Sequence, residues 1–439
     1  MSCRRTLMFL IYALVFSLPI STASYATNGH QLSAIGAYQQ GMGGATTAAP
    51  YDASTAISNP AGMALIGNRT DFSFQTFLPQ RELSFSGGGD TTGGSNWYLV
   101  PAIGWTAPID DRNDWFFGGG MYGVSGMGVD YDTVSAPFMS MMLPGWDPGS
   151  SKAHIYSQYQ FWKMAPTLSY RSGGLAIGLA LNLDYQAFGF ESYYTGTTGG
   201  GTVDVSLGMD MSEMQGALGY GATVGLIYQI IPEFAVGLSY SSKQNFGEFK
   251  WRLSDGDINM DYYFQSMGYP AGMGISQDGI YKMDLDFPQQ AAFGIAVRLG
   301  GPVLWTADVK WINYSDTYNV VKVEGAFTGG LREIPMQFGW DDVWVYATGL
   351  QIDVTPKLVI RAGYNYSTSP INKEDVENNV AFPAIVEQRV AGGFTYRLGR
   401  HWELTMAYMK AFKEELTGLS GTKISLEEQA ADFELSYRF

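Results

Sequence analysis

Repeated stretches of strictly alternating residues constrain the fold of this chain more than any other feature. From residue 175 to residue 186, large apolar side chains occupy every odd position, and small or polar side chains occupy every even position. The same alternation recurs at residues 303–311, 358–366 and 402–408. Because successive side chains of a strand point to opposite faces, this pattern predicts strands whose two faces meet different environments.

The composition indicates that one of these environments is lipid. After the first 26 residues no apolar run approaches 18 residues, which excludes membrane-spanning helices. Charged residues make up only 15% of the chain, against roughly 25% in soluble domains, and aromatic residues also make up 15%. Mean hydropathy is −0.05, because apolar and polar residues are evenly mixed. We therefore expect an all-β, 14-stranded antiparallel transmembrane barrel with aromatic residues at its two interfaces.

The first 26 residues are predicted to be a signal peptide that is cleaved after export. Arg4 and Arg5 precede an apolar stretch at 7–20, and Ser24-Tyr25-Ala26 is a small-x-small cleavage site. A membrane anchor is the alternative, but about 14 apolar residues are too few for the roughly 20 that span a bilayer. Cys3, the only cysteine, lies in this peptide, so no disulfide or thiolate metal site is expected in the mature chain.

The charge of the mature chain bears on its partners. Without Arg4 and Arg5, the 26 basic residues become 24 against 41 acidic ones, a net charge of 24 − 41 = −17. Nucleic acid is not expected as a partner, because phosphate binding needs a basic surface. A solvated exterior and acidic loops are sufficient to explain the charge.

Strand starts and connection lengths predict the barrel's orientation. The candidate strands begin near Thr70, Tyr98, Asp114, His154, Gly174, Met214, Glu233, Tyr281, Val303, Val343, Leu358, Ile385, His401 and Ala430. Short connections alternate with long ones, and residues 191–213 and 415–429 are both expected to be long loops. Since outer-membrane barrels have short periplasmic turns and long outer loops, both chain ends should be periplasmic.

The last residues form an alternating strand that stops at an aromatic residue. Phe433, Leu435, Tyr437 and Phe439 alternate with polar residues. Such a strand is similar to the signal that the outer-membrane barrel assembly machinery reads. We expect localisation in a bacterial outer membrane, contact with its lipid and lipopolysaccharide, and a monomeric barrel.

Residues 27–68 do not read as a strand of the barrel, which we assign to residues 69–439. This segment is rich in small residues and includes Asn59, Pro60, Ala61 and Gly62. It is too long for a loose terminus and too weakly charged for a disordered tail. A 14-stranded barrel leaks unless its interior is filled, so we interpret the segment as a hatch in the lumen.

Several motifs carry a resemblance to a known family. They are Gly41-Met42-Gly43-Gly44-Ala45, Asp52-Ala53-Ser54-Thr55, Asn59-Pro60-Ala61-Gly62-Met63-Ala64, Asp286-Phe287-Pro288-Gln289, Trp340-Asp341-Asp342, Arg361-Ala362-Gly363-Tyr364 and Ser369-Pro370. In these motifs the chain resembles the FadL-type outer-membrane transporters of long-chain fatty acids and aromatic hydrocarbons. The resemblance implies passive transport, capture by outer loops, and lateral release beside a kinked third strand.

The third strand contains a feature that fits a lateral opening. Gly118, Gly119 and Gly120 are consecutive, and Gly126 and Gly128 follow them. Glycine in a strand interior marks bulges and bends. We predict that Gly118–Gly120 bend the strand inward and open the barrel sideways close to Asn59-Pro60-Ala61. The alternative is that these glycines only make room for the hatch to pack against the wall.

Apolar stretches in the predicted outer loops are candidate ligand-binding sites. The candidate residues are Phe138, Met139, Met141, Met142, Leu143, Trp146, Met260, Tyr262, Tyr263, Phe264, Met267 and Tyr269. Exposed apolar clusters mark binding surfaces, and methionine adapts to ligands of different shape. The alternative is that these loops pack on each other and form a lid.

The sequence contains no pattern of residues that points to catalysis or metal binding. Its histidines, His30, His154 and His401, lie in unrelated segments and form no metal-ligand or nucleophile–base pattern. We therefore expect no enzyme activity, no cofactor and no metal. Inward Asp308, Lys310, Arg361, Arg389 and Arg397 are candidates for a ligand carboxylate or for ion pairs within the lumen. Two other functions stay open: an open porin for small polar solutes, and a surface adhesin without a transport role.

Overall fold

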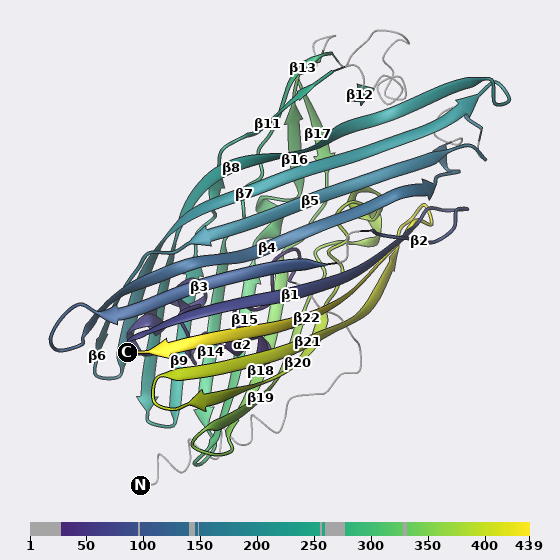
Figure 1. Ribbon diagram of the computed structural model, residues 1–439. Helices are drawn as coiled ribbons and strands as arrows, with labels where there is room; N and C mark the ends of the chain where they lie inside the picture. The colour runs from purple at the N-terminus through teal and green to yellow at the C-terminus, as the bar shows by residue number, and fades with distance from the viewer. Residues whose placement is uncertain are drawn as a thin grey trace.

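The computed structural model describes residues 28–94, 97–139, 145–147, 149–254, 257–259, 277–327 and 332–439. Fourteen antiparallel strands follow one another around a closed ring, as predicted (Figure 1). The ring closes where β22 pairs with β1, from Arg69↔Arg438 to Ser84↔Lys423. β5 and β6 together form one strand of the ring, because both lie between β4 and β7.

The strands of the ring differ widely in length. They are β1 (Arg69–Ser84), β3 (Tyr98–Pro108), β4 (Trp115–Ser135), β5 (Lys152–Met164), β6 (Thr167–Ser172), β7 (Leu175–Thr198), β8 (Val203–Ile231), β9 (Phe234–Ser241), β14 (Gln290–Arg298), β15 (Val303–Ile312), β18 (Val343–Asp353), β19 (Leu358–Ser367), β20 (Gln388–Leu398), β21 (Trp402–Thr417) and β22 (Lys423–Arg438).

Shorter elements lie in the connections and in the N-terminal segment. The helices are α2 (Ala37–Gly41), α3 (Thr55–Ser58), η1 (Pro60–Ala64), η2 (Tyr314–Asp316), η3 (Lys373–Asp375) and η4 (Glu377–Asn379). The strands β11 (Phe249–Leu253), β13 (Gly279–Met283), β16 (Val320–Glu324) and β17 (Glu333–Gln337) form a separate small sheet. The short strands β2 (Thr91–Thr92), β10 (Asn245–Phe246) and β12 (Ile258–Asn259) extend the large sheet.

The alternation in the sequence corresponds to the two faces of the wall. On β7, the odd-numbered residues from Leu175 to Tyr185 are exposed, with Leu181 at 54%, whereas Asn182, Asp184 and Gln186 are buried. The apolar exposed set is what lipid requires, and the polar buried set lines the lumen. Period-2 patterning was therefore sufficient to predict the fold class.

Eleven of the fourteen predicted strand starts lie within three residues of the observed ones. Tyr281 is wrong, because it belongs to β13 of the small sheet and the ring strand begins only at Gln290. Met214 and Ala430 are also wrong, because β8 begins at Val203 and β22 at Lys423. The predicted loops 191–213 and 415–429 are thus mostly strand, since two hairpins extend well past the length of a membrane span.

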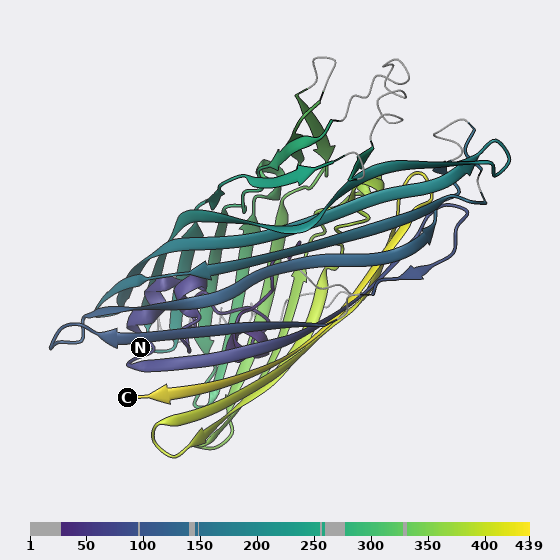
Figure 2. The ribbon, with the colours of Figure 1, turned by 45° about the horizontal axis from the view of Figure 1, so that its top comes forward.

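The two ends of the barrel differ. The short connections and the C-terminus lie at one end, and the small sheet of β11, β13, β16 and β17 projects from the other (Figure 1). The N-terminal segment runs within the ring of strands (Figure 2). Its helix α2 contacts β19 to β22, while η1 contacts β4, β6, β7 and β8. Residues 28–64 therefore bridge opposite parts of the wall.

Candidate functional site

Buried carboxylates of the wall fasten the middle of the N-terminal segment. The amide of Ala37 donates to Glu434 Oε2 at 3.1 Å, and the amide of Thr47 donates to Asp308 Oδ2 at 2.8 Å. A third amide, that of Ala53, donates to Asp71 Oδ2 at 2.7 Å. These three buried hydrogen bonds hold residues 37–53 against the wall.

The Asn59-Pro60-Ala61-Gly62 motif forms a tight turn that docks on the wall. Asn59 Oδ1 accepts from the amide of Ala61 at 3.2 Å and caps η1. Its Nδ2 donates to the carbonyl oxygens of Thr47 at 2.7 Å and Leu226 at 3.3 Å. Gly62 permits the turn, because a β-carbon there would lie 2.2 Å from Thr55 Oγ1. The motif therefore joins two parts of the segment to β8.

The predicted glycine run of the third strand lies at a local irregularity. Gly119 has φ +134°, in the region that favours glycine. Across from it, Pro166 interrupts the strand formed by β5 and β6, and the amide of Ala165 donates to the Gly120 carbonyl oxygen at 3.0 Å. On the other side, pairing with β3 continues through Gly118–Gly120. The irregularity is confined to one side of β4 here.

The helix η1, which begins at Pro60, lies against β4 next to this run. The Asn59 side chain, which we expected to satisfy the strand there, bonds to β8 instead. Met63 faces Gly118, where an added β-carbon would lie 2.9 Å from Met63 Cε, and Thr106 Oγ1 donates to the Met63 carbonyl oxygen at 3.3 Å. The run thus gives Met63 space against the wall, as the alternative interpretation proposed.

A larger break in the wall lies further along the same strand. The pairing of β3 with β4 ends at Ala102↔Tyr122, and none of the described pairings joins residues 98–101 to residues 123–129. Pro101, the first residue of β3 beyond this pairing, still pairs with Phe74 of β1 but has no N–H to donate. On β4, Val124 is a bulge, because pairing with β5 shifts between Gly123 and Ser125.

The start of the N-terminal segment pairs with β4 at this break. Gln31 and Ser125 form an isolated antiparallel bridge, and the amide of Leu32 donates to the Val124 carbonyl oxygen at 3.1 Å. Ser125 Oγ donates to the His30 carbonyl oxygen at 2.7 Å and lies 2.6 Å from His30 Nδ1. Residues 30–32 therefore satisfy backbone groups that β3 leaves unpaired.

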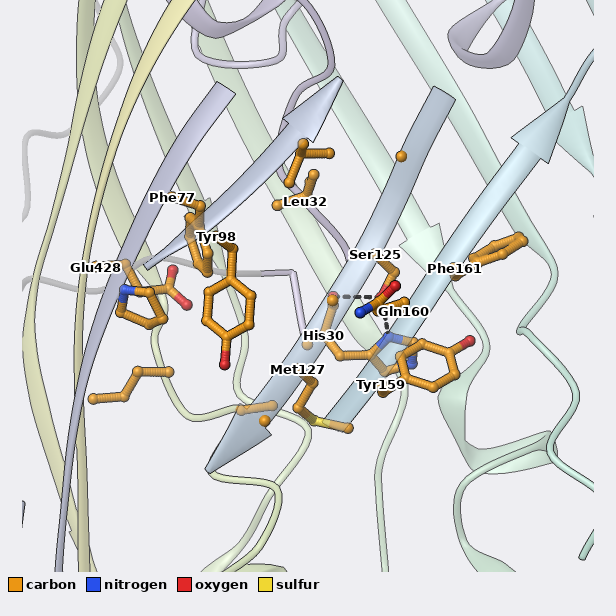
Figure 3. A pocket seen from close by; sticks show the side chains of 18 of the residues that line it. His30, Leu32, Phe77, Tyr98, Ser125, Met127, Tyr159, Gln160, Phe161 and Glu428 are labelled. Atoms are coloured by element: carbon orange, nitrogen blue, oxygen red, sulfur yellow. Dashed lines mark hydrogen bonds between the residues drawn. The ribbon is translucent and has the colours of Figure 1, made fainter. Parts of the chain in front are cut away.

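A cavity of about 290 Å³, here called the wall cavity, lies at the break (Figure 3). Inside the barrel it is lined by His30, Leu32 and Tyr159. Its lining also includes Leu99, which is 50% exposed on the outer face, and Gly126, which is exposed between Ser125 and Met127. Residues of both faces of the wall therefore border the same cavity, which lies beside the gap between β3 and β4.

His30 lies in an aromatic cage at the inner side of the wall cavity. Ring centroids are 4.8 to 5.6 Å from its own for five side chains, Tyr159, Phe287, Tyr314, Tyr318 and Trp340. His30 is 3% exposed, and burial lowers its pKa to about 3, although a backbone hydrogen bond opposes this shift. The imidazole is therefore neutral, and its Nε2 has no partner among the described residues.

Sequence reasoning had not identified this cage. The quoted motifs Asp286-Phe287-Pro288-Gln289 and Trp340-Asp341-Asp342 each supply one ring, so they were available as a signal. The sequence alone does not show that the five rings meet, because they come from β5 and from connections that are far apart in the chain.

Of the predicted loop residues, only Phe138, Met139 and Trp146 lie in the described part of the chain. The remaining ones lie outside it: Met141, Met142, Leu143, Met260, Tyr262, Tyr263, Phe264, Met267 and Tyr269. Met139 and Trp146 are 2% and 3% exposed, and Phe138 packs 4.8 Å from Phe85. Met139 and Trp146 are therefore buried rather than exposed as expected, and Phe138 is half-buried; the role of all three in capture stays a prediction.

The candidate lumen charges mostly serve the N-terminal segment. Asp308 accepts from Thr47, and Arg389 Nη1 donates to Asn28 Oδ1 at 3.0 Å. Arg361 lies over the Tyr38 and Tyr51 rings at 4.8 Å and donates to wall side chains. Arg397 pairs with Glu403 at 3.3 Å. Lys310, with Lys163, lines a small polar cavity beside Gln31.

Comparison with known proteins places these features in a family. The family model described as outer membrane protein transport protein (OMPP1/FadL/TodX) matches residues 18–436, nearly the whole chain. The chain belongs to the FadL/TodX family of outer membrane transport proteins. The resemblance seen in the motifs is thereby confirmed. No curated protein sequence matches the chain.

Solved structures of FadL/TodX proteins share the fold. The toluene transporter TodX of Pseudomonas putida is 19% identical, with a TM-score of 0.70 over 94% of this chain and 100% of its own. The toluene transporter TbuX of Ralstonia pickettii is 16% identical, with a TM-score of 0.66 over 93% and 99%. A FadL homologue of Pseudomonas aeruginosa is 14% identical, with a TM-score of 0.67 over 95% and 99%.

No helix in the described part of the chain is long and apolar enough to cross a membrane. No group of three or more His, Cys, Asp or Glu side chains there is placed to hold a metal ion. The FadL/TodX family and its structural neighbours consist of transporters and channels rather than enzymes.

Proposed function

We propose that this outer membrane protein conducts hydrophobic molecules, long-chain fatty acids or hydrocarbons, into the outer membrane by passive diffusion. The observation that carries the proposal is the wall cavity, whose lining combines lumen residues with Leu99 and Gly126 of the outer face. An apolar molecule in the lumen reaches lipid sideways through this cavity. The lateral route avoids the aqueous periplasm, where such a molecule is poorly soluble.

The opening is assigned to Gly123–Gly128 rather than to Gly118–Gly120. Backbone groups that face hydrocarbon without partners cost several kcal/mol each, so a break in a membrane wall needs other partners. Residues 30–32 supply them at Val124 and Ser125. Cargo that enters the wall must therefore displace residues 30–32 while it passes.

Only the first part of the hatch has to move. Residues 37–53 are held by the buried carboxylates Glu434, Asp308 and Asp71. Residues 28–35 precede Gly36, whose φ of +84° allows a sharp change of direction. We therefore assign Gly36 as the hinge, Asn28–Ile35 as the moving part, and the remainder of the hatch as a fixed plug.

The same proposal covers capture, export and orientation. Phe138, Met139 and Trp146, with the other apolar residues of the outer connections, would receive cargo from outside. The signal peptide would be removed at residue 26, the barrel assembly machinery would insert a monomer among lipid and lipopolysaccharide, and both termini would be periplasmic. The short connections and the C-terminus at one end of the barrel support this orientation.

The open porin is the main competing function. A plugged lumen conducts few ions, whereas a porin conducts continuously. We expect the purified protein in planar bilayers to show little steady ion conductance, and reconstituted vesicles to take up toluene or oleate faster than empty ones. Continuous porin-like conductance without uptake of either molecule would reject the proposal. An adhesin would likewise leave uptake by cells unchanged when its gene is deleted.

A further inference from the structure

The connection between β19 and β20 is buried to an unusual degree for a loop. It comprises residues 368–387 and lies at the end of the barrel opposite to the short connections. Residues 380–386 are all buried, with Phe382 at 3% and Val386 at 0% exposed. Connections normally run over the surface, because their backbone polar groups need partners such as water. This connection must therefore find its partners inside the barrel.

The connection, here called the crossing segment, reaches the opposite wall. β19 and β20 are the eleventh and twelfth strands of the ring, whereas β5 and β7 belong to the fourth and fifth. Ser157 Oγ of β5 donates to the Ala381 carbonyl oxygen at 2.6 Å. The Phe382 ring lies 6.0 Å from that of Phe188 and 5.7 Å from that of Phe190, both on β7. Since half of the ring separates these strands from β19 and β20, the crossing segment spans the lumen.

Asn379 fixes the crossing segment to the connection between β17 and β18. Its Nδ2 donates to the carbonyl oxygens of Phe338 at 2.7 Å and Asp375 at 2.8 Å. Its Oδ1 accepts from Trp340 Nε1 at 2.6 Å. The buried backbone is partly satisfied within the segment, because the amide of Phe382 donates to the Asn379 carbonyl oxygen at 2.9 Å. Asn379 is 0% exposed, so these bonds are made away from water and hold the segment in one place.

The two sides of the crossing segment meet different environments. Residues 372–374 and 378 are exposed and polar. On the other side, Phe382 borders a small cavity, here called the inner cavity, which also touches Leu285 and Trp340. Pro383 and Ala384 line the wall cavity. The crossing segment thus lies between the exposed outer end of the barrel and both cavities.

We propose that the crossing segment is a second closure of the barrel, which keeps ions and polar solutes out of the lumen independently of the N-terminal hatch. In the described part of the chain, no hydrogen bond, ion pair or ring contact joins residues 368–387 to residues 28–68. A 14-stranded barrel is wide enough to conduct when its filling moves. A closure that stays in place while residues 28–35 move keeps the membrane tight at that moment. The assignment does not depend on which cargo is carried or where cargo leaves.

The side chains beside the crossing segment make this closure selective. The inner cavity is lined by apolar and aromatic side chains and by no charged one among the described residues. An ion that enters it loses its hydration and gains no partner, which is strongly unfavourable. An apolar molecule is favoured in the same surroundings. The outer end therefore excludes solutes by polarity.

Single-cysteine labelling tests the closure in the full-length protein. The only cysteine is Cys3, in the predicted signal peptide, so an introduced thiol is the only one in the mature chain. Leu285→Cys places a thiol in the inner cavity, and Gly89→Cys places one on the exposed outer surface. In lipid nanodiscs, a charged methanethiosulfonate should label Leu285→Cys at least about a hundredfold more slowly than Gly89→Cys, because labelling requires local opening.

Variants of the crossing segment in the Leu285→Cys background set the size of the effect. Asn379→Ala removes three buried hydrogen bonds and should speed labelling by about tenfold or more. Phe382→Leu keeps an apolar side chain but loses the ring contacts with β7, and should speed labelling by about two- to fivefold. Asn378→Ala is the matched control, since this neighbouring asparagine is exposed, and should leave the rate unchanged. The heat-dependent electrophoretic mobility of a folded barrel checks that each variant is assembled.

A hatch variant tests whether the two closures are independent. Asp308→Ala, which removes the acceptor of the Thr47 amide, should change the labelling rate of Leu285→Cys by less than about twofold. If it speeds labelling as much as Asn379→Ala does, the barrel has one closure and the proposal is overturned. The proposal also fails if assembled Asn379→Ala and Phe382→Leu variants label no faster than Asn378→Ala. These rates do not require transport of any cargo, so failure of the transport proposal would leave the test valid.

Discussion

Pro60 and Gly178 lie in direct contact across the inner face of β7. A β-carbon added to Gly178 would lie 2.3 Å from the carbonyl carbon of Pro60. The same relationship joins Gly43 to Gly363, where an added β-carbon would lie 2.1 Å from the Gly43 nitrogen. Glycines of the wall thus allow the N-terminal segment to approach its backbone, which explains part of the chain's high glycine content.

The contact between Pro60 and Gly178 gives a first prediction. Gly178→Val should undock η1, because overpacking a tight interface costs about 1–3 kcal/mol. Hydrogen exchange at the amides of Gly62 and Leu65, which bond within this turn, should become faster. Gly89→Val is the matched control, since nothing lies within 4 Å of an added β-carbon there. Equal protection in both variants would show that the close contact is not needed.

The second prediction concerns the anchor at Asp308. Asp308→Ala removes the acceptor of the Thr47 amide, and a buried donor without a partner costs about 1–3 kcal/mol. We expect the Thr47 amide to exchange faster by a factor that corresponds to this energy. Asp308→Asn keeps an oxygen in place and should retain most of the protection. An unchanged rate in the alanine variant would mean that other contacts hold this part of the hatch.

The ring of strands could be predicted from the sequence because its signal is local. Side chains of each spanning strand point alternately to lipid and to the lumen. The residue type therefore indicates the face, as with exposed Leu181 and buried Asn182, without information from the remaining chain. Tyr281 misled the prediction because β13 of the small sheet also alternates, with Tyr281 and Met283 buried. Periodicity identifies a strand but not the sheet to which it belongs.

The site was harder to predict from the sequence than the fold, because its features depend on several segments at once. The wall break needs Pro101 on β3, a bulge at Val124 on β4, and residues 30–32 to satisfy the freed backbone. The run of three consecutive glycines predicted an opening at Gly118–Gly120, which are close in sequence to the break. No local pattern distinguishes a glycine that accommodates Met63 from one that borders an opening.

A third prediction follows from the pKa of His30. The docked imidazole has a pKa of about 3, below the ordinary 6.5, so the released form binds more protons at acidic pH. Docking is therefore fully stable above pH 6.5 and weakens as the pH falls toward 3. At pH 4.5, two units below 6.5, the loss should be about 2.7 kcal/mol.

Hydrogen exchange at Leu32, whose amide bonds to Val124, measures this loss. After correction for intrinsic rates, its protection should fall by about a hundredfold between pH 7.5 and pH 4.5. His30→Phe keeps a ring in the cage but does not titrate, so its protection should be nearly constant. The tyrosines that face His30 remain neutral throughout this range. The same change with pH in both proteins would exclude His30 as its source.

The last prediction tests the opening in the wall. Of the three glycines of β4 at the break, Gly126 alone accepts a side chain without a clash, because an added β-carbon would lie 3.6 Å from the Tyr159 carbonyl oxygen, an ordinary contact. At Gly123 it would lie 2.3 Å from Val100 Cγ1, and at Gly128 it would lie 2.6 Å from the Ser157 carbonyl oxygen. Gly126→Phe should therefore preserve the barrel and fill the outer side of the wall cavity with a ring.

We expect Gly126→Phe to slow uptake of apolar cargo by about tenfold, which corresponds to an added barrier of about 1.4 kcal/mol. Gly149→Phe, where nothing lies within 4 Å of an added β-carbon, controls for the extra hydrophobic surface. Substitutions at Gly118–Gly120 are less informative, since each β-carbon would lie within 2.3 Å of a backbone oxygen of a neighbouring strand. Normal uptake by a correctly folded Gly126→Phe variant would mean that cargo does not leave between β3 and β4. Cargo would then have to leave past Asn59–Gly62, at the end of the barrel that bears the short connections.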